Sequence, residues 1–213
     1  MSAKSKFEFE VYTDGTVGIT GYNGNDAIVE IPSTIEGKTV TEIREWAFID
    51  CNWVTNVTIP DSVEIIGEFA FNGCTKLTSV TIGKGIISIG NGAFVNTGYG
   101  NNPSNWEDGV LYIGDYLIDA NLSVSGNYVV KDGTRLIAEC AFWGCTRLTG
   151  VVIPSSVTHI CDYAFRYCTN LVDILSSDGL EYLGFGIDIN CDKLEHIAWP
   201  NSVKKVGNAI VNN

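Results

Sequence analysis

The pair of residues most suggestive of nucleophilic chemistry is His159 and Cys161, two positions apart. A histidine next to a cysteine can take the thiol proton and so create a nucleophile. Both residues, however, follow the register of a repeat that runs along the chain, in which His159 takes the position of Ile65 and Ser88. We therefore interpret the pair as a product of the repeat and not as a catalytic dyad.

Motifs for metals and cofactors are missing from the sequence. The two histidines, His159 and His196, fall at different repeat positions, which does not suit the clustered ligands of a zinc site. There is no glycine-rich phosphate loop, no Gly-x-Ser-x-Gly motif and no Asp-rich calcium loop. We expect no enzyme activity, no cofactor and no metal; an enzyme with an unrecognised site is the remote alternative.

The chain has seven cysteines, a number that would suit disulfides. Cysteines on parallel, stacked coils present their Cβ atoms in a poor geometry for bridging, so we expect small buried hydrophobic residues. Cys140 and Cys161 lie at other offsets and receive no partner. The remaining five share one repeat position: Cys51, Cys74, Cys145, Cys168 and Cys191.

A repeat of 23 residues must position these side chains. An alanine-phenylalanine pair marks it, with steps of 23, 23, 48 and 23 residues between pairs. A fixed period of this size indicates a solenoid, in which each repeat forms one coil of a stack. The phenylalanines should form an internal ladder: Phe48, Phe71, Phe94, Phe142 and Phe165.

Each coil contains a short run of β-branched residues with near alternation, as in residues 77–82, which predicts a strand. Pro60, Pro154 and Pro200 follow equivalent strands and end them at a corner, because proline cannot donate to a ladder. The predicted fold is a β-rich solenoid with parallel stacked strands, an N-terminal capping hairpin and one inserted hairpin. The conformation of the Ala-Phe segment, a tight turn or a short 3₁₀ piece, stays open.

The composition sets limits on partners and location. The net charge of −12 repels phosphate backbones, so we do not expect nucleic acid as a partner. No apolar run approaches the roughly 20 residues of a spanning helix. Residues 1–6 contain no apolar signal-peptide core. Two interpretations stay open: a cytosolic protein, or a sequence that lacks the natural chain's export signal.

Irregular segments interrupt the repeat. Residues 1–23 predict a capping hairpin around Asp14-Gly15, and residues 24–213 a solenoid, together one domain. Five extra residues at 35–39 should bulge at a corner of the first coil. An insertion at 98–126 should form a flap with a hairpin over residues 110–113 and 116–118. The last coils depart from the repeat pattern, and Ala209-Ile210 is the last pair that resembles Ala-Phe. Degenerate ends are typical of a cap; the alternative is a chain cut inside a longer array.

The run Ile-Pro-x-x-Val-x-x-Ile-Gly, then Ala-Phe and Cys, is clearest in residues 59–74 and resembles the BspA-type leucine-rich-repeat family. Residues 31–37 and 105–112 are similar to that family's opening and island segments, and the resemblance covers residues 17–211. It implies a surface or secreted protein with a role in adhesion, and it brings no catalytic motif. The asparagine usual in leucine-rich repeats is absent after the strand.

Three surfaces are candidates for binding. The first is the outward strand face, where repeat proteins bind along extended surfaces and where Val152, Val172 and Leu175 predict an apolar cluster. The second is an aromatic strip at the Ala-Phe corner, with Trp46, Trp143 and Tyr167. The alternative interpretation is that these side chains only cover the corner of the core. The third is the insert. The candidate partner-binding residues are Thr55, Asn56, Thr58, Thr78, Ser79, Thr81, Thr149, Val152, Asp173, Leu175, Trp106 and Tyr112.

The leading hypothesis is a non-enzymatic binding scaffold that recognises a protein or a glycan. A structural spacer within a longer surface protein is the alternative. An exposed end of the stack could also associate end to end, because unpaired strand edges favour pairing.

Overall fold

The computed structural model describes residues 6–207, and it divides into two compact units with the boundary between Asn105 and Trp106. Each unit is a stack of coils with strands on two sides of the coil. The described residues contain one short 3₁₀ helix, η1 (Pro103–Asn105), at the end of the first unit. No helix among them is long and apolar enough to cross a bilayer.

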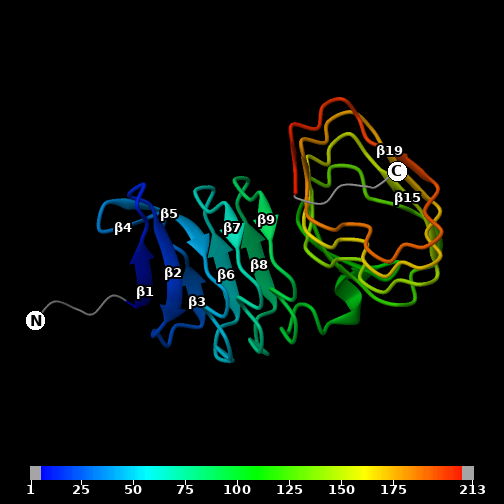
Figure 1. The fold of residues 1–213 in the computed structure, drawn as a ribbon. Coiled ribbons are helices and arrows are strands. Elements are labelled where there is room, and N and C mark those ends of the chain that lie inside the picture. The colour runs from blue at the N-terminus through cyan, green and yellow to red at the C-terminus, as the bar shows by residue number, and fades with distance from the viewer. Residues whose placement is uncertain (1–5, 208–213) are drawn as a thin grey trace, which may run out of the picture. The chain divides into compact units, whose positions relative to one another are not determined.

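The first unit carries two sheets. An antiparallel hairpin caps the larger sheet, and parallel strands follow it coil by coil, as β2, β5, β7 and β9 in Figure 1. The smaller sheet is parallel throughout. The larger sheet contains β1 (Phe7–Val11), β2 (Val17–Tyr22), β4 (Thr34–Ile35), β5 (Lys38–Ile43), β7 (Ile65–Ile66) and β9 (Ser88–Ile89); the smaller contains β3 (Ile28–Glu30), β6 (Asn56–Ile59) and β8 (Ser79–Ile82).

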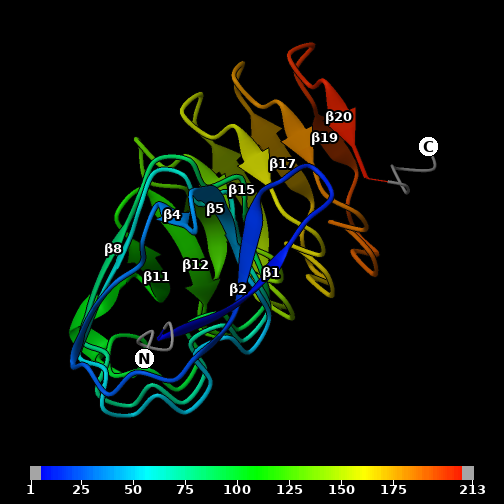
Figure 2. The same cartoon turned by 90° about the vertical axis from the view of Figure 1, so that its left-hand side faces the viewer.

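The second unit repeats this plan. Its larger sheet also begins with antiparallel strands and continues in parallel, while Figure 2 shows strands of its smaller sheet side by side. The larger sheet contains β10 (Trp106–Glu107), β11 (Val110–Ile113), β12 (Tyr116–Ala120), β14 (Leu136–Ile137), β16 (His159–Ile160), β18 (Tyr182–Leu183) and β20 (Lys205–Val206); the smaller contains β13 (Gly126–Val129), β15 (Leu148–Ile153), β17 (Asp173–Ser176) and β19 (His196–Ala198).

The predicted solenoid with a 23-residue period is confirmed by the strand registers. Val57 pairs with Val80, and Val151 pairs with Ile174, each 23 positions along the chain. The phenylalanine ladder is confirmed within each unit. Phe71 stacks on Phe48 at 4.9 Å and on Phe94 at 5.3 Å between ring centroids. Phe142 and Phe165 stack at 5.3 Å in the second unit.

The predicted capping hairpin is confirmed over the described residues, with Gly15 in the turn at a φ of +87°. The extra residues of the first coil form a second tight hairpin, in which β4 pairs with β5. Its two turn residues, Glu36 and Gly37, both have positive φ, as the type I′ turn requires. Residues 1–5 and the pair Ala209-Ile210 lie outside the described residues.

The inserted hairpin is also confirmed, and Ile113 pairs with Tyr116 across Gly114-Asp115. Its role differs from the expected flap. Strand β12 pairs in parallel with β14, so the hairpin is built into the sheet of the second unit and begins it as β1 and β2 begin the first. A solenoid end needs such a cover because the first coil would otherwise expose its core and a strand edge. The division of the chain into a cap and one domain stays a prediction.

The Ala-Phe segment is a run of turns with two left-handed residues per coil. The residue just before the pair has φ between 53° and 61° in Trp46, Phe69, Gly92, Cys140, Tyr163 and Gly186. The second comes three residues after the alanine, at φ between 55° and 77° in Asp50, Gly73, Asn96, Gly144, Tyr167 and Asn190. A non-glycine residue in this region costs about 1–2 kcal/mol, so side chains other than glycine are retained here against a local cost.

All seven cysteines are free. Four on the shared repeat position, Cys74, Cys145, Cys168 and Cys191, donate to carbonyl groups of the coil before them. The Sγ atom of Cys74 lies 3.1 Å from the Phe48 carbonyl oxygen, and that of Cys168 lies 3.1 Å from the Phe142 oxygen. Thr97, at the same position, is buried and donates to the Phe94 oxygen at 2.8 Å. The thiol column therefore satisfies buried carbonyl groups and does not present nucleophiles.

Candidate binding surfaces

The outward face of the first unit's smaller sheet is polar apart from Ile28 of β3, which is 65% exposed beside Asn56. Asn56 and Ser79 pair in one row, and Thr58 and Thr81 in the next, with Glu30 of β3 completing that second row. Thr55 and Thr78 precede the strands. The Thr55 hydroxyl donates a hydrogen bond to the Ala27 carbonyl oxygen at 3.0 Å. The predicted residues do share one face, but it has the composition of an ordinary solvated sheet.

The equivalent face of the second unit differs in one row. Val129, Val152 and Leu175 occupy successive strands in direct register, and they are 65, 37 and 48% exposed. We call these three residues the apolar row. Asp173 lies in the neighbouring row, opposite Gly150, and Thr149 is exposed in β15.

The apolar row is not the cluster expected from the sequence. Val172 precedes β17 and is half-buried, and Val129 takes its place in the row. The signal for Val129 was present, because it lies 23 residues before Val152. The insertion hid it by displacing the alanine-phenylalanine marker of that coil.

The insert contributes less surface than expected. Tyr112 is only 6% exposed and belongs to the core of the second unit, where its hydroxyl lies 2.9 Å from that of Tyr128. The expectation that Tyr112 contacts a partner is therefore wrong, because the ring is inside. Trp106 lies half-buried in β10.

The Ala-Phe corner carries exposed aromatic residues in both units. In the first unit Trp46, 42% exposed, stacks on Phe69 at 4.5 Å. In the second unit the guanidinium of Arg166 lies over three rings, at 4.8 Å from Trp143 and 5.1 Å from both Tyr163 and Tyr167. We call these four residues the arginine corner. The sequence predicted an aromatic strip at this corner. It did not predict a role for Arg166, because the same repeat position holds unrelated residues in other coils.

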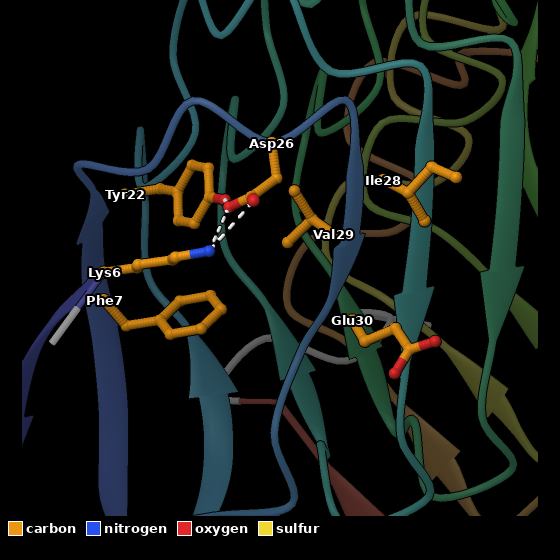
Figure 3. A pocket seen from close by; sticks show the side chains of 7 residues that line it. All are labelled: Lys6, Phe7, Tyr22, Asp26, Ile28, Val29 and Glu30. Atoms are coloured by element: carbon orange, nitrogen blue, oxygen red, sulfur yellow. Dashed lines mark hydrogen bonds and ion pairs between the residues drawn. The ribbon is translucent and has the colours of Figure 1, made fainter.

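A small pocket of about 270 Å³ lies at the start of the first unit, between β1 and β3. Figure 3 shows the Lys6 ammonium directed at Asp26, and Glu30 directed away from that pair. Lys6 Nζ lies 2.7 Å from Asp26 Oδ2, and the Tyr22 hydroxyl donates to the same carboxylate at 2.6 Å. These bonds hold the pKa of Asp26 below its usual value, chiefly through Lys6. Lys6, Asp26 and Tyr22 thus satisfy one another within the pocket.

The histidine-cysteine pair lies at the end of β16, where His159 is half-buried and Cys161 is buried. His159 Nδ1 lies 2.9 Å from Thr158 Oγ1, and its ring lies 5.8 Å from that of Tyr182. Burial lowers the pKa of His159. Cys161 is buried, with 3% of its surface exposed. Among residues 6–207, no three or more His, Cys, Asp or Glu side chains are grouped so as to hold a metal ion.

The fold and these surfaces define the class of protein: a leucine-rich-repeat solenoid whose exposed features are flat faces and corners. The BspA type leucine rich repeat region, in six copies, matches residues 28–123 and 100–213, so the chain belongs to this family. No curated protein matches the chain.

Solved structures of leucine-rich-repeat proteins are similar to this chain. The T. pallidum leucine rich repeat protein is 27% identical with a TM-score of 0.50, covering 95% of this chain and 92% of that one. A protein from Bacteroides capillosus is 26% identical with a TM-score of 0.41, covering 82% and 96%. A leucine rich cell surface protein from Faecalibacterium prausnitzii is 19% identical with a TM-score of 0.43, covering 96% and 83%.

Proposed function

We propose that this chain is a non-enzymatic binding scaffold that contacts a protein partner through the outward face of β13, β15, β17 and β19. The observation that carries the proposal is the apolar row. Its three aliphatic side chains are exposed on adjacent strands, although the equivalent row of the first unit is built from Glu30, Thr58 and Thr81. Contiguous exposed apolar side chains rimmed by polar ones are typical of interaction sites.

The geometry favours a protein over a glycan on this face. Strands of a sheet lie about 4.8 Å apart, so the row presents an aliphatic ridge roughly 10 Å long. Such a ridge gains free energy by packing against aliphatic side chains, and it offers few hydrogen-bonding groups to sugar hydroxyls. We extend the proposal to a surface or secreted setting with a role in adhesion, which the family resemblance implies.

The proposal is tested by giving the second unit the residues of the first. The double variant Val152→Thr, Leu175→Thr copies Thr58 and Thr81, which the same strand geometry tolerates. The full chain is screened against a panel of matrix proteins and a glycan array by biolayer interferometry. Each lost buried methylene is worth about 0.8 kcal/mol, so we expect affinity for the partner to fall five- to thirty-fold.

The matched control is Thr58→Val, Thr81→Val in the first unit, which should leave binding unchanged. Equal binding by the Val152→Thr, Leu175→Thr variant and the wild type would overturn the role of this face. A folded protein that binds nothing on the panel would favour the spacer.

A further inference from the structure

Arg166 is a cation without an anionic or hydrogen-bonding partner. Among the described residues, its side chain forms no ion pair and no hydrogen bond, and its Nε atom is buried without an acceptor. A guanidinium has five N–H donors in a fixed fork, and donors without acceptors are unusual in folded proteins. The three surrounding rings attract the charge but accept none of these hydrogen bonds in the ordinary sense. Nε is the buried donor, whereas the terminal Nη groups are not buried and are the donors that an acceptor from outside can reach.

The rings fix the position of the fork in advance. The guanidinium carbon is within 5.1 Å of the centroids of Trp143, Tyr163 and Tyr167. Trp143 and Tyr167 also contact each other, with centroids 5.7 Å apart, and they remain 42 and 38% exposed. An arginine held between rings has already lost much of its conformational freedom, so a ligand that binds it avoids that entropic cost.

This arrangement is retained against a local backbone cost. Tyr163 and Tyr167 both have left-handed backbones, with φ of 56° and 62°. Equivalent positions hold glycine in some coils, as at Gly186 and Gly144, and a non-glycine residue in others, as at Trp46 and Asp50. One coil thus carries two strained aromatic residues, and both lie against the unpaired arginine.

From these observations we propose that the arginine corner binds a carboxylate, supplied by an aspartate or glutamate side chain of a protein partner. This inference rests on the proposed function only in that both require a binding partner. The fork matches a carboxylate through two parallel hydrogen bonds. One guanidinium neutralises one negative charge, and the chain as a whole carries −12, so a dianionic phosphate would lack compensation.

A protein partner suits the corner better than an acidic glycan. Tryptophan, tyrosine and arginine are the residues most enriched at energetic hot spots of protein interfaces. The guanidinium already covers one face of each of the three rings, whereas a sugar would need an open face to stack on. Aliphatic or aromatic neighbours of the acidic residue would pack on the exposed parts of Trp143 and Tyr167.

The test uses the full chain and an array of nonapeptides with a central glutamate between varied apolar residues, each matched by the same peptide with glutamine. A second array carries uronate and sialate glycans. Four proteins are compared with the wild type, with melting temperature as the check on folding: Arg166→Gln, Arg166→Lys, Tyr167→Gly and the control Arg147→Gln. Arg147 is an exposed arginine of the same unit, so its variant changes the net charge equally. Tyr167→Gly keeps the charge and places glycine where φ is 62°, so it should fold.

We expect a subset of glutamate peptides to bind. Glutamine in the peptide, or Arg166→Gln in the protein, should weaken binding at least tenfold, and the two changes together should weaken it little further. Arg166→Lys should weaken binding several-fold, because lysine lacks the forked pair of donors. Tyr167→Gly should also weaken binding several-fold, because it removes a ring that holds the guanidinium in place. Arg147→Gln should change affinity less than twofold.

Three results would overturn the inference: equal binding of glutamate and glutamine peptides, binding to acidic glycans alone, or an equal loss in Arg147→Gln. The two proposals can fail independently of each other. If Val152→Thr, Leu175→Thr abolishes partner binding while Arg166 variants retain it, the sheet face stands and the arginine corner falls.

Discussion

Raising the pH from 8 to 10 should destabilise the first unit through its buried thiols. Burial raises the pKa of Cys51 to about 11 and that of Cys74 to about 12, from 9.0 for an ordinary thiol. Between pH 9 and these values the unfolded chain loses thiol protons that the folded unit keeps. Stability falls as pH rises wherever the folded state binds more protons, so the effect is an alkaline loss that is absent below pH 8.

The magnitude follows from the two shifts. Each group contributes about 1.4 kcal/mol per pH unit once the unfolded thiol has ionised, which gives about 1.3 kcal/mol for each thiol between pH 8 and pH 10. The two together amount to about 3 kcal/mol, a large part of the 5–15 kcal/mol that typically stabilises a domain. Burial and hydrogen bonding also raise the pKa of Tyr12 and Tyr22 to about 12, but their contribution becomes large only above pH 10.

A threonine variant isolates the thiol from every other titrating group. Cys74→Thr copies Thr97, which occupies the same repeat position in the next coil and donates to the Phe94 carbonyl of its own coil, so the variant hydroxyl has an acceptor within reach. Urea unfolding under reducing conditions at pH 8, 9 and 10 should show the pH-dependent loss reduced by about 1.3 kcal/mol in the variant. Identical pH dependence in wild type and variant would refute the assignment, as would native thiols that react with Ellman's reagent at the rate of free cysteine.

Two further predictions concern packing between coils. Gly90→Ala should destabilise the first unit by more than about 2 kcal/mol in urea unfolding, because the new Cβ would lie 2.5 Å from the Glu68 backbone nitrogen. Gly133→Ala faces open space at φ +85° and should cost only about 1 kcal/mol; equal losses would contradict the close approach. Phe71→Leu loses two ring stacks and Phe165→Leu one, so Phe71→Leu should cost about 1 kcal/mol more when each unit's unfolding is followed; the reverse order would refute the ladder's contribution.

The features that the sequence predicted well are those that every coil repeats. The phenylalanine ladder and the thiol column follow from a fixed period, because a residue that recurs every 23 positions must meet its own copies in a stack. The hairpins at Asp14-Gly15 and Gly114-Asp115 follow from turn chemistry that glycine supplies locally. These inferences need no knowledge of the partner, since each depends on neighbours that the repeat itself defines.

The candidate sites were harder to predict because they depend on departures from the repeat. Val129 joins the apolar row only through its pairing with Val152, and the insertion had removed the marker of its coil. Tyr112 is of a residue type that is common in recognition loops, but the pairing of β12 with β14 places its hairpin in the core. A binding role for Arg166 could not be predicted from the sequence, because a single charged residue in a variable repeat position gives no periodic signal.

The arginine corner also illustrates how a repeat can acquire specificity. The two left-handed positions hold glycine in some coils, as at Gly92 and Gly144, and other residues in the rest, so they accept side chains that vary from coil to coil. The coil of residues 163–167 accepts two tyrosines at φ of 56° and 62° and places an arginine between them. The tyrosines bring backbone strain and Arg166 brings one buried donor without an acceptor, while the contacts of the guanidinium with three rings offset part of these costs. A bound carboxylate would accept hydrogen bonds from the terminal nitrogens, and a partner that packs on the rings would offset the backbone cost. A coil that is locally less stable than its neighbours, and that binding would stabilise, is what a recognition site in a repeat protein requires.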